Sequence, residues 1–220
     1  MQTYSHILIT AVISLPLKQL VDSRSLVLPQ VRIKALLLGS LLPDLALILI
    51  AVVCLTRDWL LGVFSSNEWV NHDMLVKASD ELLNLSWTAS LFDDWFFNNP
   101  IVITLQNTFH SPFILVLLIG IVYWYWNKTR YIPSDKKLNN AFSYLFWVFC
   151  AALLHTLIDI PLHTTDGPLI FFPIDWSYRY ASPISYWDPM HHGRAWSLFE
   201  HSLDVVLAIY LLWFWYKAKK

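Results

Sequence analysis

The chain has 220 residues, of which 56% are hydrophobic and only 14% are charged. A soluble domain carries about 25% charged residues, so this composition indicates a protein whose main solvent is lipid. The formal net charge of −1 provides no global positive field, and we therefore expect no nucleic-acid partner. Cys54 and Cys150 both lie inside apolar runs, which argues against a structural disulfide.

Five apolar runs predict the membrane-spanning helices. The first run, 7–17, is short, and it predicts either a tilted span that extends to Val21 or a re-entrant segment. The later runs are each long enough to cross a hydrocarbon core of about 30 Å as a helix. They cover residues 35–55, 100–126, 141–160 and 195–216. We expect an all-α, polytopic helical membrane bundle with about five transmembrane helices, forming a single integral membrane domain over 1–220.

The connection 56–99 is long for a membrane bundle, and it mixes tryptophans with acids. Interfacial helices lying on the membrane surface would explain this mixture, and so would a solvated loop with anchoring aromatic side chains. The same connection could act as a lid or as a docking surface for a protein partner.

The charges in the connections predict the orientation. Lys and Arg gather in 18–34, in 127–140 and in the C-terminal tail, whereas 56–99 and 161–194 carry more acids than bases. The positive-inside rule then places the N-terminus outside and the C-terminus in the cytoplasm. If the first run does not cross, only the N-terminus changes side. In a bacterium this predicts the inner (plasma) membrane, and an organellar membrane fits the same pattern.

Ionisable side chains of the spans gather toward the outer side. Each costs about 2.5–3.5 kcal/mol on insertion scales, so their presence inside a bilayer requires a reason. Taken singly, a membrane histidine often only bonds a neighbouring helix, Asp44 could cap a helix broken at Pro43, and Glu200 could be a first-turn acid favoured by the helix dipole. Residues with unrelated structural roles would not be expected to lie all toward the outer side of the membrane, so the joint pattern favours a metal site. The group is His6, Asp44, His110, His155, Asp159, Glu200, His201 and Asp204.

His155 and Asp159 are spaced i, i+4, so they share a helix face and could share one ion. Pro161 should end that helix, which places His163 on the exit turn and Asp166 in the following loop. Imidazole and carboxylate ligands favour zinc, with manganese or iron as alternatives, and no thiolate is well placed for a softer metal.

Several of these motifs carry a family resemblance. They are His6, Leu-Pro-Asp ending at Asp44, His110-Ser111, and a signature over 155–177 and 182–193 that begins HTLID. With them the chain resembles the membrane-bound metal-dependent hydrolases of bacterial inner membranes, the YdjM-like group, and within it a subgroup sometimes labelled cobalamin biosynthesis proteins. A more distant similarity is to zinc-dependent phospholipases C, whose His-x-x-x-Asp pair matches His155 and Asp159. Their His-x-x-x-Glu pair and their N-terminal Trp ligand have no counterpart, which argues against a three-metal site.

We therefore expect a membrane-embedded, metal-dependent hydrolase with its site at the non-cytoplasmic side, acting on a phospholipid or a lipid-linked phosphoester. Five residues are predicted as first ligands, namely His6, Asp44, His110, His155 and Asp159. Further ligands or orienting groups are His163, Asp166 and Glu200. The predicted catalytic residues are Asp188, His191, His192 and Glu200. Phe172, Tyr186 and Trp187 are expected to wall a lipid-like substrate site. The alternative is a non-catalytic membrane scaffold or assembly protein with a structural His/Asp network.

Overall fold

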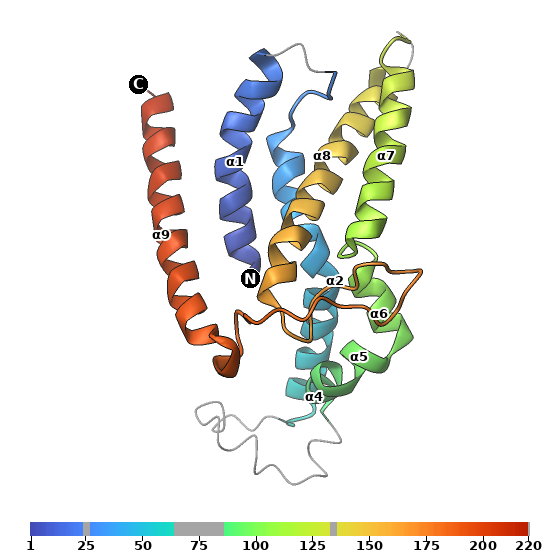
Figure 1. The fold of residues 1–220 in the computed structure, drawn as a ribbon, viewed down its shortest axis with the longest axis vertical. Coiled ribbons are helices and arrows are strands. Elements are labelled where there is room, and N and C mark those ends of the chain that lie inside the picture. The colour runs from blue at the N-terminus through green and yellow to red at the C-terminus, as the bar shows by residue number, and fades with distance from the viewer. Residues whose placement is uncertain (24–26, 64–85, 133–135, 220) are drawn as a thin grey trace. The chain divides into compact units, whose positions relative to one another are not determined.

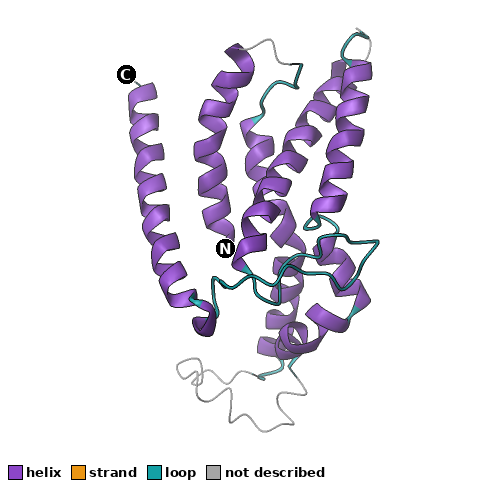
Figure 2. Ribbon diagram, viewed as in Figure 1, coloured by secondary structure: helices purple, strands orange, loops and turns teal. Residues whose placement is uncertain are grey.

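The structure is a computed structural model that describes residues 1–23, 27–63, 86–132 and 136–219. The described residues form helices joined by turns and one long loop, and the only strand-like pairing among them is an isolated bridge between Leu169 and Arg179 (Figure 2). The predicted all-α membrane bundle is thereby confirmed.

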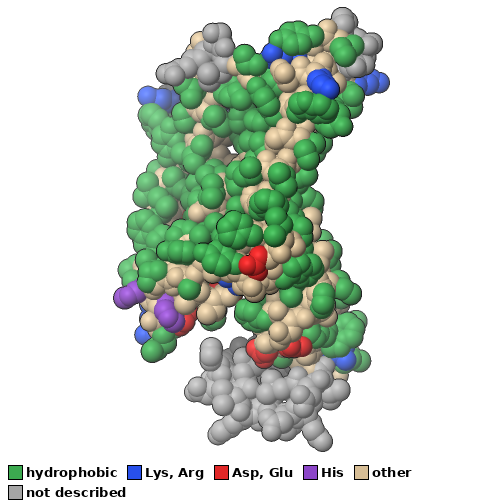
Figure 3. All heavy atoms as spheres, turned by 45° about the vertical axis from the view of Figure 1, so that its right-hand side comes forward, with side chains coloured by type: hydrophobic (Ala, Val, Ile, Leu, Met, Phe, Trp, Pro, Cys, Tyr) green, Lys and Arg blue, Asp and Glu red, His purple; other side chains and the backbone are tan. Residues whose placement is uncertain are grey.

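Five of the described helices are long and apolar enough to cross a membrane. The first of them is 21 residues long, so the run near the N-terminus forms a full-length helix instead of a short re-entrant piece. On the face drawn in Figure 3, hydrophobic side chains cover most of the helix surfaces, as expected for contact with lipid. The five helices are α1 (Thr3–Ser23), α2 (Ile33–Leu60), α7 (Pro112–Thr129), α8 (Lys136–Asp159) and α9 (Gly193–Ala218).

The chain divides into two compact units, and the larger one comprises Met1–Pro43 and Asn107–Lys220. In this unit α7 and α8 pack against each other as a hairpin, together with the first turns of α2 (Figure 1). Helices α2 and α8 approach closely at Gly39 of α2, where an added Cβ would lie 2.1 Å from the carbonyl oxygen of Val148 on α8. The absence of a side chain at Gly39 therefore allows these two backbones to meet.

Helices α1 and α9 lie side by side in the same unit, and they run in the same direction (Figure 1). The backbone nitrogen of Gln2 donates to Glu200 at 2.6 Å, and the hydroxyl of Ser5 donates to Asp204 at 2.9 Å. Glu200 and Asp204 are one turn apart, so they present their carboxylates along one face of α9 to the first turn of α1.

The smaller unit comprises Asp44–Gln106. It contains the rest of α2, followed by α4 (Trp87–Ser90), a π-helical turn (Leu91–Trp95), α5 (Phe96–Asn98) and most of α6 (Pro100–Asn107). The buried carboxylate of Asp58 accepts hydrogen bonds from Ser86 and from the backbone of Trp87 and Thr88, so it holds the start of α4. The connection predicted to carry interfacial helices is thus helical over 87–98, and its residues 64–85 lie outside the described residues.

The apolar run 100–126 does not form one helix, contrary to the sequence-based prediction. Helix α6 ends at Asn107, and α7 begins at Pro112 with Ser111 in an extended conformation before it. Proline suits the first turn of a helix because it has no N–H to leave unpaired, and it disfavours helical geometry in the residue before it. His110 therefore lies in the break between two helices, not inside a span.

Candidate metal centre

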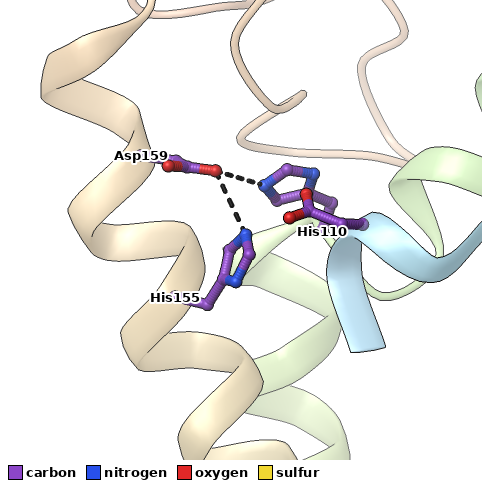
Figure 4. Close-up of side chains that lie close together, drawn as sticks. His110, His155 and Asp159 are labelled. Atoms are coloured by element: carbon purple, nitrogen blue, oxygen red, sulfur yellow. Dashed lines mark ion pairs between the residues drawn. The ribbon is translucent and has the colours of Figure 1, made fainter. Parts of the chain in front are cut away.

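Asp159, the last residue of α8, lies at the centre of a buried group of histidines. Its Oδ2 atom is 3.2 Å from Nε2 of His155, one turn earlier on the same helix. The same oxygen is 3.3 Å from Nε2 of His110, which comes from the break before α7. Figure 4 shows both rings pointing at the carboxylate.

These separations fit ligands of a single ion. The ligand atoms that His110, His155 and Asp159 offer all lie within 4.8 Å of one another. Two ligands of a tetrahedral ion with bonds of about 2.0–2.1 Å lie about 3.3 Å apart. The two nitrogen-to-oxygen distances match that spacing, so these three side chains could hold a metal ion.

The ring of His155 is oriented by a backbone group. Its Nδ1 atom lies 2.7 Å from the carbonyl oxygen of Ser40 on α2, and an acceptor at that distance requires a proton on Nδ1. In the neutral ring Nε2 then carries a lone pair, and this is the atom that faces Asp159. A histidine whose second nitrogen donates to a carbonyl is the usual arrangement of a metal ligand.

His6, from the first turns of α1, joins the group from the other side of the carboxylate. Its Nε2 lies 2.9 Å from Oδ1 of Asp159, which also forms an ion pair with the amino group of Met1 at 3.0 Å. The His6 ring is stacked on that of His155 with centroids 3.6 Å apart, and both side chains are buried. His6 is thus brought to the predicted site, where it contacts the carboxylate oxygen opposite His110 and His155.

His163 follows the short 3-10 turn after α8, as predicted from Pro161. Its Nε2 lies 3.9 Å from Oδ2 of Asp159, and its Nδ1 lies 3.1 Å from Asp166, whose carboxylate also accepts from the indole of Trp187. Burial alone would raise the pKa of Asp166, but the hydrogen bonds from His163 and Trp187 lower it below its ordinary value. A line of polar contacts therefore leads from Asp159 through His163 to the loop.

Asp44, another predicted ligand, follows Pro43 on α2 and is the first residue of the smaller unit. It is partly buried. Because Pro43 is accommodated inside a continuous α2, Asp44 does not cap a broken helix, which removes one of the alternatives considered for it.

The predicted catalytic residues of the loop form a pair of their own. Nδ1 of His191 lies 2.6 Å from Asp188, which also accepts from the backbone nitrogen of Met190. The bond with His191 holds the pKa of Asp188 below its ordinary value. His192 is exposed, with a left-handed φ of 65°. Within the described part of the chain, Asp188, His191 and His192 make no hydrogen bond or ion pair with Asp159.

Glu200 is buried, and its observed hydrogen bond is the one to Gln2 at the start of α1. His201, the next residue, is exposed and contacts the hydroxyl of Tyr4 at 3.2 Å. The structure therefore gives Glu200 a place in the packing of α1 against α9, and its predicted catalytic role stays a prediction.

The loop between α8 and α9 is anchored by residues that the sequence analysis missed. Buried Asn107 accepts from the backbone nitrogen of Leu169 at 2.9 Å, and Ser111 donates to the carbonyl oxygens of Ile170 and Phe172. Ser182 donates to the carbonyl oxygen of Pro161. The available signal was the position of Ser111 directly after His110, because a buried serine beside a candidate ligand must find a partner.

Of the aromatic residues expected to wall a substrate site, Tyr186 packs edge-on against the ring of His163, with centroids 5.0 Å apart. Phe172 is buried, and Trp187 is exposed while its indole bonds Asp166. Tyr186 and Trp187 therefore lie beside the polar line that leads to Asp159, and Phe172 lies in the segment anchored by Ser111.

Comparison with known proteins gives one match. No curated protein and no solved structure matches the chain. The family model described as "YdjM inner membrane protein" matches residues 1–220, the whole of the sequence. Together with the five apolar helices, this match supports an integral protein of the inner membrane. The chain belongs to the YdjM inner membrane protein family.

Proposed function

We propose that this protein is a membrane-embedded, metal-dependent hydrolase. The observation that carries the proposal is the placement of Nε2 of His110 and Nε2 of His155 at 3.3 and 3.2 Å from one carboxylate oxygen of Asp159. Asp159 is buried and pairs with the Met1 amino group through Oδ1, and a cation bound at Oδ2, which the rings of His110 and His155 face, would further offset the cost of this carboxylate in a bilayer.

His110, His155 and Asp159 would hold the ion, and zinc suits this mixture of imidazole and carboxylate best, with manganese or iron as alternatives. An ion bound there would polarise a phosphoryl or acyl oxygen and would lower the pKa of a bound water to about 7. His6 would fix the carboxylate of Asp159 through its other oxygen, and Ser40 would fix the ring of His155.

Asp44 is the best candidate for a further ligand. It lies four residues after Ser40 on α2, so its side chain shares the helix face whose carbonyl bonds His155. With the carboxylate of Asp44, four protein side chains would bind the ion. Water or substrate could then bind only if the ion accepts a fifth ligand or if one side chain moves away.

The substrate would be a lipid with a phosphoester or acyl bond. Supporting this, the loop that follows the site exposes large apolar side chains, including Trp176, Trp187 and Met190, which suit the interface between lipid and water. The excess of Lys and Arg at the opposite helix ends would put the site at the non-cytoplasmic side and the C-terminus in the cytoplasm. His191, held by the ionised carboxylate of Asp188, would act as general acid or base once a substrate draws their loop closer.

An activity screen tests the proposal. Purified protein is incubated with a panel of phospholipids and lipid-linked phosphoesters, and the products are followed by mass spectrometry. We expect turnover that falls at least about 100-fold in His110→Ala and Asp159→Asn and that persists in His201→Ala, the matched control on an exposed histidine. Turnover unchanged when His110, His155 and Asp159 are all replaced would contradict the proposal.

A second function is favoured by one observation. Glu200 accepts a hydrogen bond from the backbone nitrogen of Gln2 and Asp204 accepts one from Ser5, so two acids of the predicted group contribute to the packing of α9 against α1. The corresponding proposal is a non-catalytic scaffold protein that docks a partner through the connection 56–99. It predicts that the purified protein is folded but hydrolyses none of the lipids. It also predicts a partner protein that no longer binds when part of the connection 56–99 is deleted.

A further inference from the structure

A cavity of about 540 Å³ opens among α1, α2 and α8, within the larger unit. Its walls carry three cationic side chains, namely Lys18 near the end of α1 and Arg32 and Lys34 at the start of α2. Asn140 and Tyr144, one turn apart on α8, complete the polar lining. A volume of this size is within the range of about 300–1,000 Å³ that small-ligand sites occupy.

The polar part of the cavity wall is rich in hydrogen-bond donors. The guanidinium of Arg32 donates to Oδ1 of Asn140 at 3.1 Å, which fixes the Arg32 side chain and leaves the amide NH₂ of Asn140 as a donor. Lys18, Lys34 and the Tyr144 hydroxyl add further donors, and no carboxylate of the described residues lines the cavity. Among the residues that the structure describes, none of the three cations forms an ion pair with an acid. An anion with several acceptor oxygens, such as a phosphate group, matches this wall.

The surroundings of the cavity suit a lipid. Leu38 lies one turn beyond Lys34 on the same face of α2 and is 46% exposed, and Val31 and Ile33 form the apolar part of the wall. The cationic part of the cavity wall offers a place for a headgroup, and the exposed apolar face of α2 beside it offers a place for an acyl chain. We propose that this cavity binds the phosphate of an anionic phospholipid, at the end of the helices opposite the Asp159 site. Basic pockets between transmembrane helices are suited to such headgroups.

The experiment uses the full-length protein in detergent micelles, so that its orientation in a cell does not affect the result. Phosphatidylglycerol and phosphatidylcholine with the same acyl chains are added in equal amounts, and the lipid that stays bound is counted by native mass spectrometry. We expect at least a five-fold preference for phosphatidylglycerol in the parent protein, since each cation near an anionic headgroup contributes about a factor of five.

Two variants remove the site in different ways. Lys18→Gln/Lys34→Gln removes two cations, and Asn140→Asp adds a carboxylate to the wall while every cation remains. Both should lose the preference, whereas Lys136→Gln/Lys137→Gln should keep it, because these two lysines lie at the start of α8 and do not line the cavity. If the parent, Asn140→Asp and the control all showed the same preference for phosphatidylglycerol, the proposal would be overturned. This holds even if the Lys18→Gln/Lys34→Gln variant failed to fold.

A last arm separates a lipid from a free anion. Inorganic phosphate is titrated into the parent protein by calorimetry, at millimolar concentrations and without added lipid. We expect no saturable binding, because the acyl chain contributes to the affinity for the lipid. Saturable phosphate binding together with no preference for phosphatidylglycerol would overturn the assignment to lipid in favour of a free anion.

Discussion

The carbonyl oxygen of Ser40 and Nδ1 of His155 lie 2.7 Å apart, and this contact decides which nitrogen of the ring faces Asp159. Because a carbonyl can only accept, the proton sits on Nδ1 and the lone pair of the neutral ring sits on Nε2. The backbone of α2 thus orients a side chain of α8 so that its Nε2 could bind a metal ion.

The first prediction concerns this tautomer. In ¹⁵N NMR of zinc-loaded protein with labelled histidines, His155 should show a protonated Nδ1 and an unprotonated Nε2. Compared with protein without added zinc, the Nε2 signal should shift most strongly, since that atom would bind the ion. A ring protonated on Nε2 and bare on Nδ1 would contradict the arrangement.

The second prediction concerns the contact between α2 and α8. Gly39→Ala places a methyl group 2.1 Å from the carbonyl oxygen of Val148, so the helices must separate. We expect a loss of unfolding free energy of about 1–3 kcal/mol and weaker metal binding, because Ser40 moves with the helix. Thermal unfolding in detergent measures the first effect.

The matched control for this substitution is Gly120→Ala. An added Cβ at Gly120 of α7 meets no atom within 4 Å, and alanine favours a helix over glycine by about 1 kcal/mol. This variant should be as stable as the parent or slightly more stable. If the two substitutions changed the unfolding free energy equally, the close approach at Gly39 would not determine the effect of an added side chain on stability.

The third prediction concerns the anchored loop. Ser111→Ala removes the hydroxyl that bonds the carbonyl oxygens of Ile170 and Phe172. It should cost about 1 kcal/mol and should speed amide hydrogen exchange in the segment 168–172. Ser202→Ala is the control. The exposed hydroxyl of Ser202 donates to the carbonyl oxygen of Leu198 in its own helix, so its removal should leave that exchange unchanged.

The fourth prediction concerns pH. Hydrogen bonds from His191 and from the Met190 backbone lower the pKa of Asp188, so the ionised carboxylate is the form that the folded loop favours. Their stabilising effect is fully present above the ordinary pKa of about 3.9 and is lost as the pH falls through the lowered value. A ¹³C NMR titration of the Asp188 carboxyl should give a midpoint below that of an unfolded peptide.

His191→Gln provides the comparison for this titration. Glutamine cannot carry the positive charge of a protonated histidine, so the midpoint of Asp188 should move up toward its ordinary value. An identical midpoint in the parent and in His191→Gln would mean that His191 does not hold the carboxylate.

Much of the fold follows from the sequence, because long uncharged runs have few alternatives to helices in a bilayer. The break at 108–111 was missed since the run through it carries no formal charge, although Ser111-Pro112 is a standard helix start.

The candidate site was predictable in its members but not in its arrangement. The i, i+4 spacing of His155 and Asp159 predicted a shared face, and the structure places them 3.2 Å apart. The assignment of His6 to one carboxylate oxygen and of His110 to the other depends on how separate helices pack, which no local pattern contains. The contact with the carbonyl oxygen of Ser40 could not be predicted from the sequence, because every residue carries a backbone carbonyl and no side chain marks the one that will accept the bond.

Metal content tests the central claim most directly. Parent protein, His155→Ala, Asp159→Ala and the exposed-site control His201→Ala are purified without chelators, equilibrated with zinc, manganese or iron, and measured by elemental mass spectrometry beside their circular dichroism. We predict about one ion per chain in the parent and in His201→Ala, and none in the two folded site variants. A folded parent that retains no metal from any of the three solutions, or site variants that retain as much as the parent, would contradict the account.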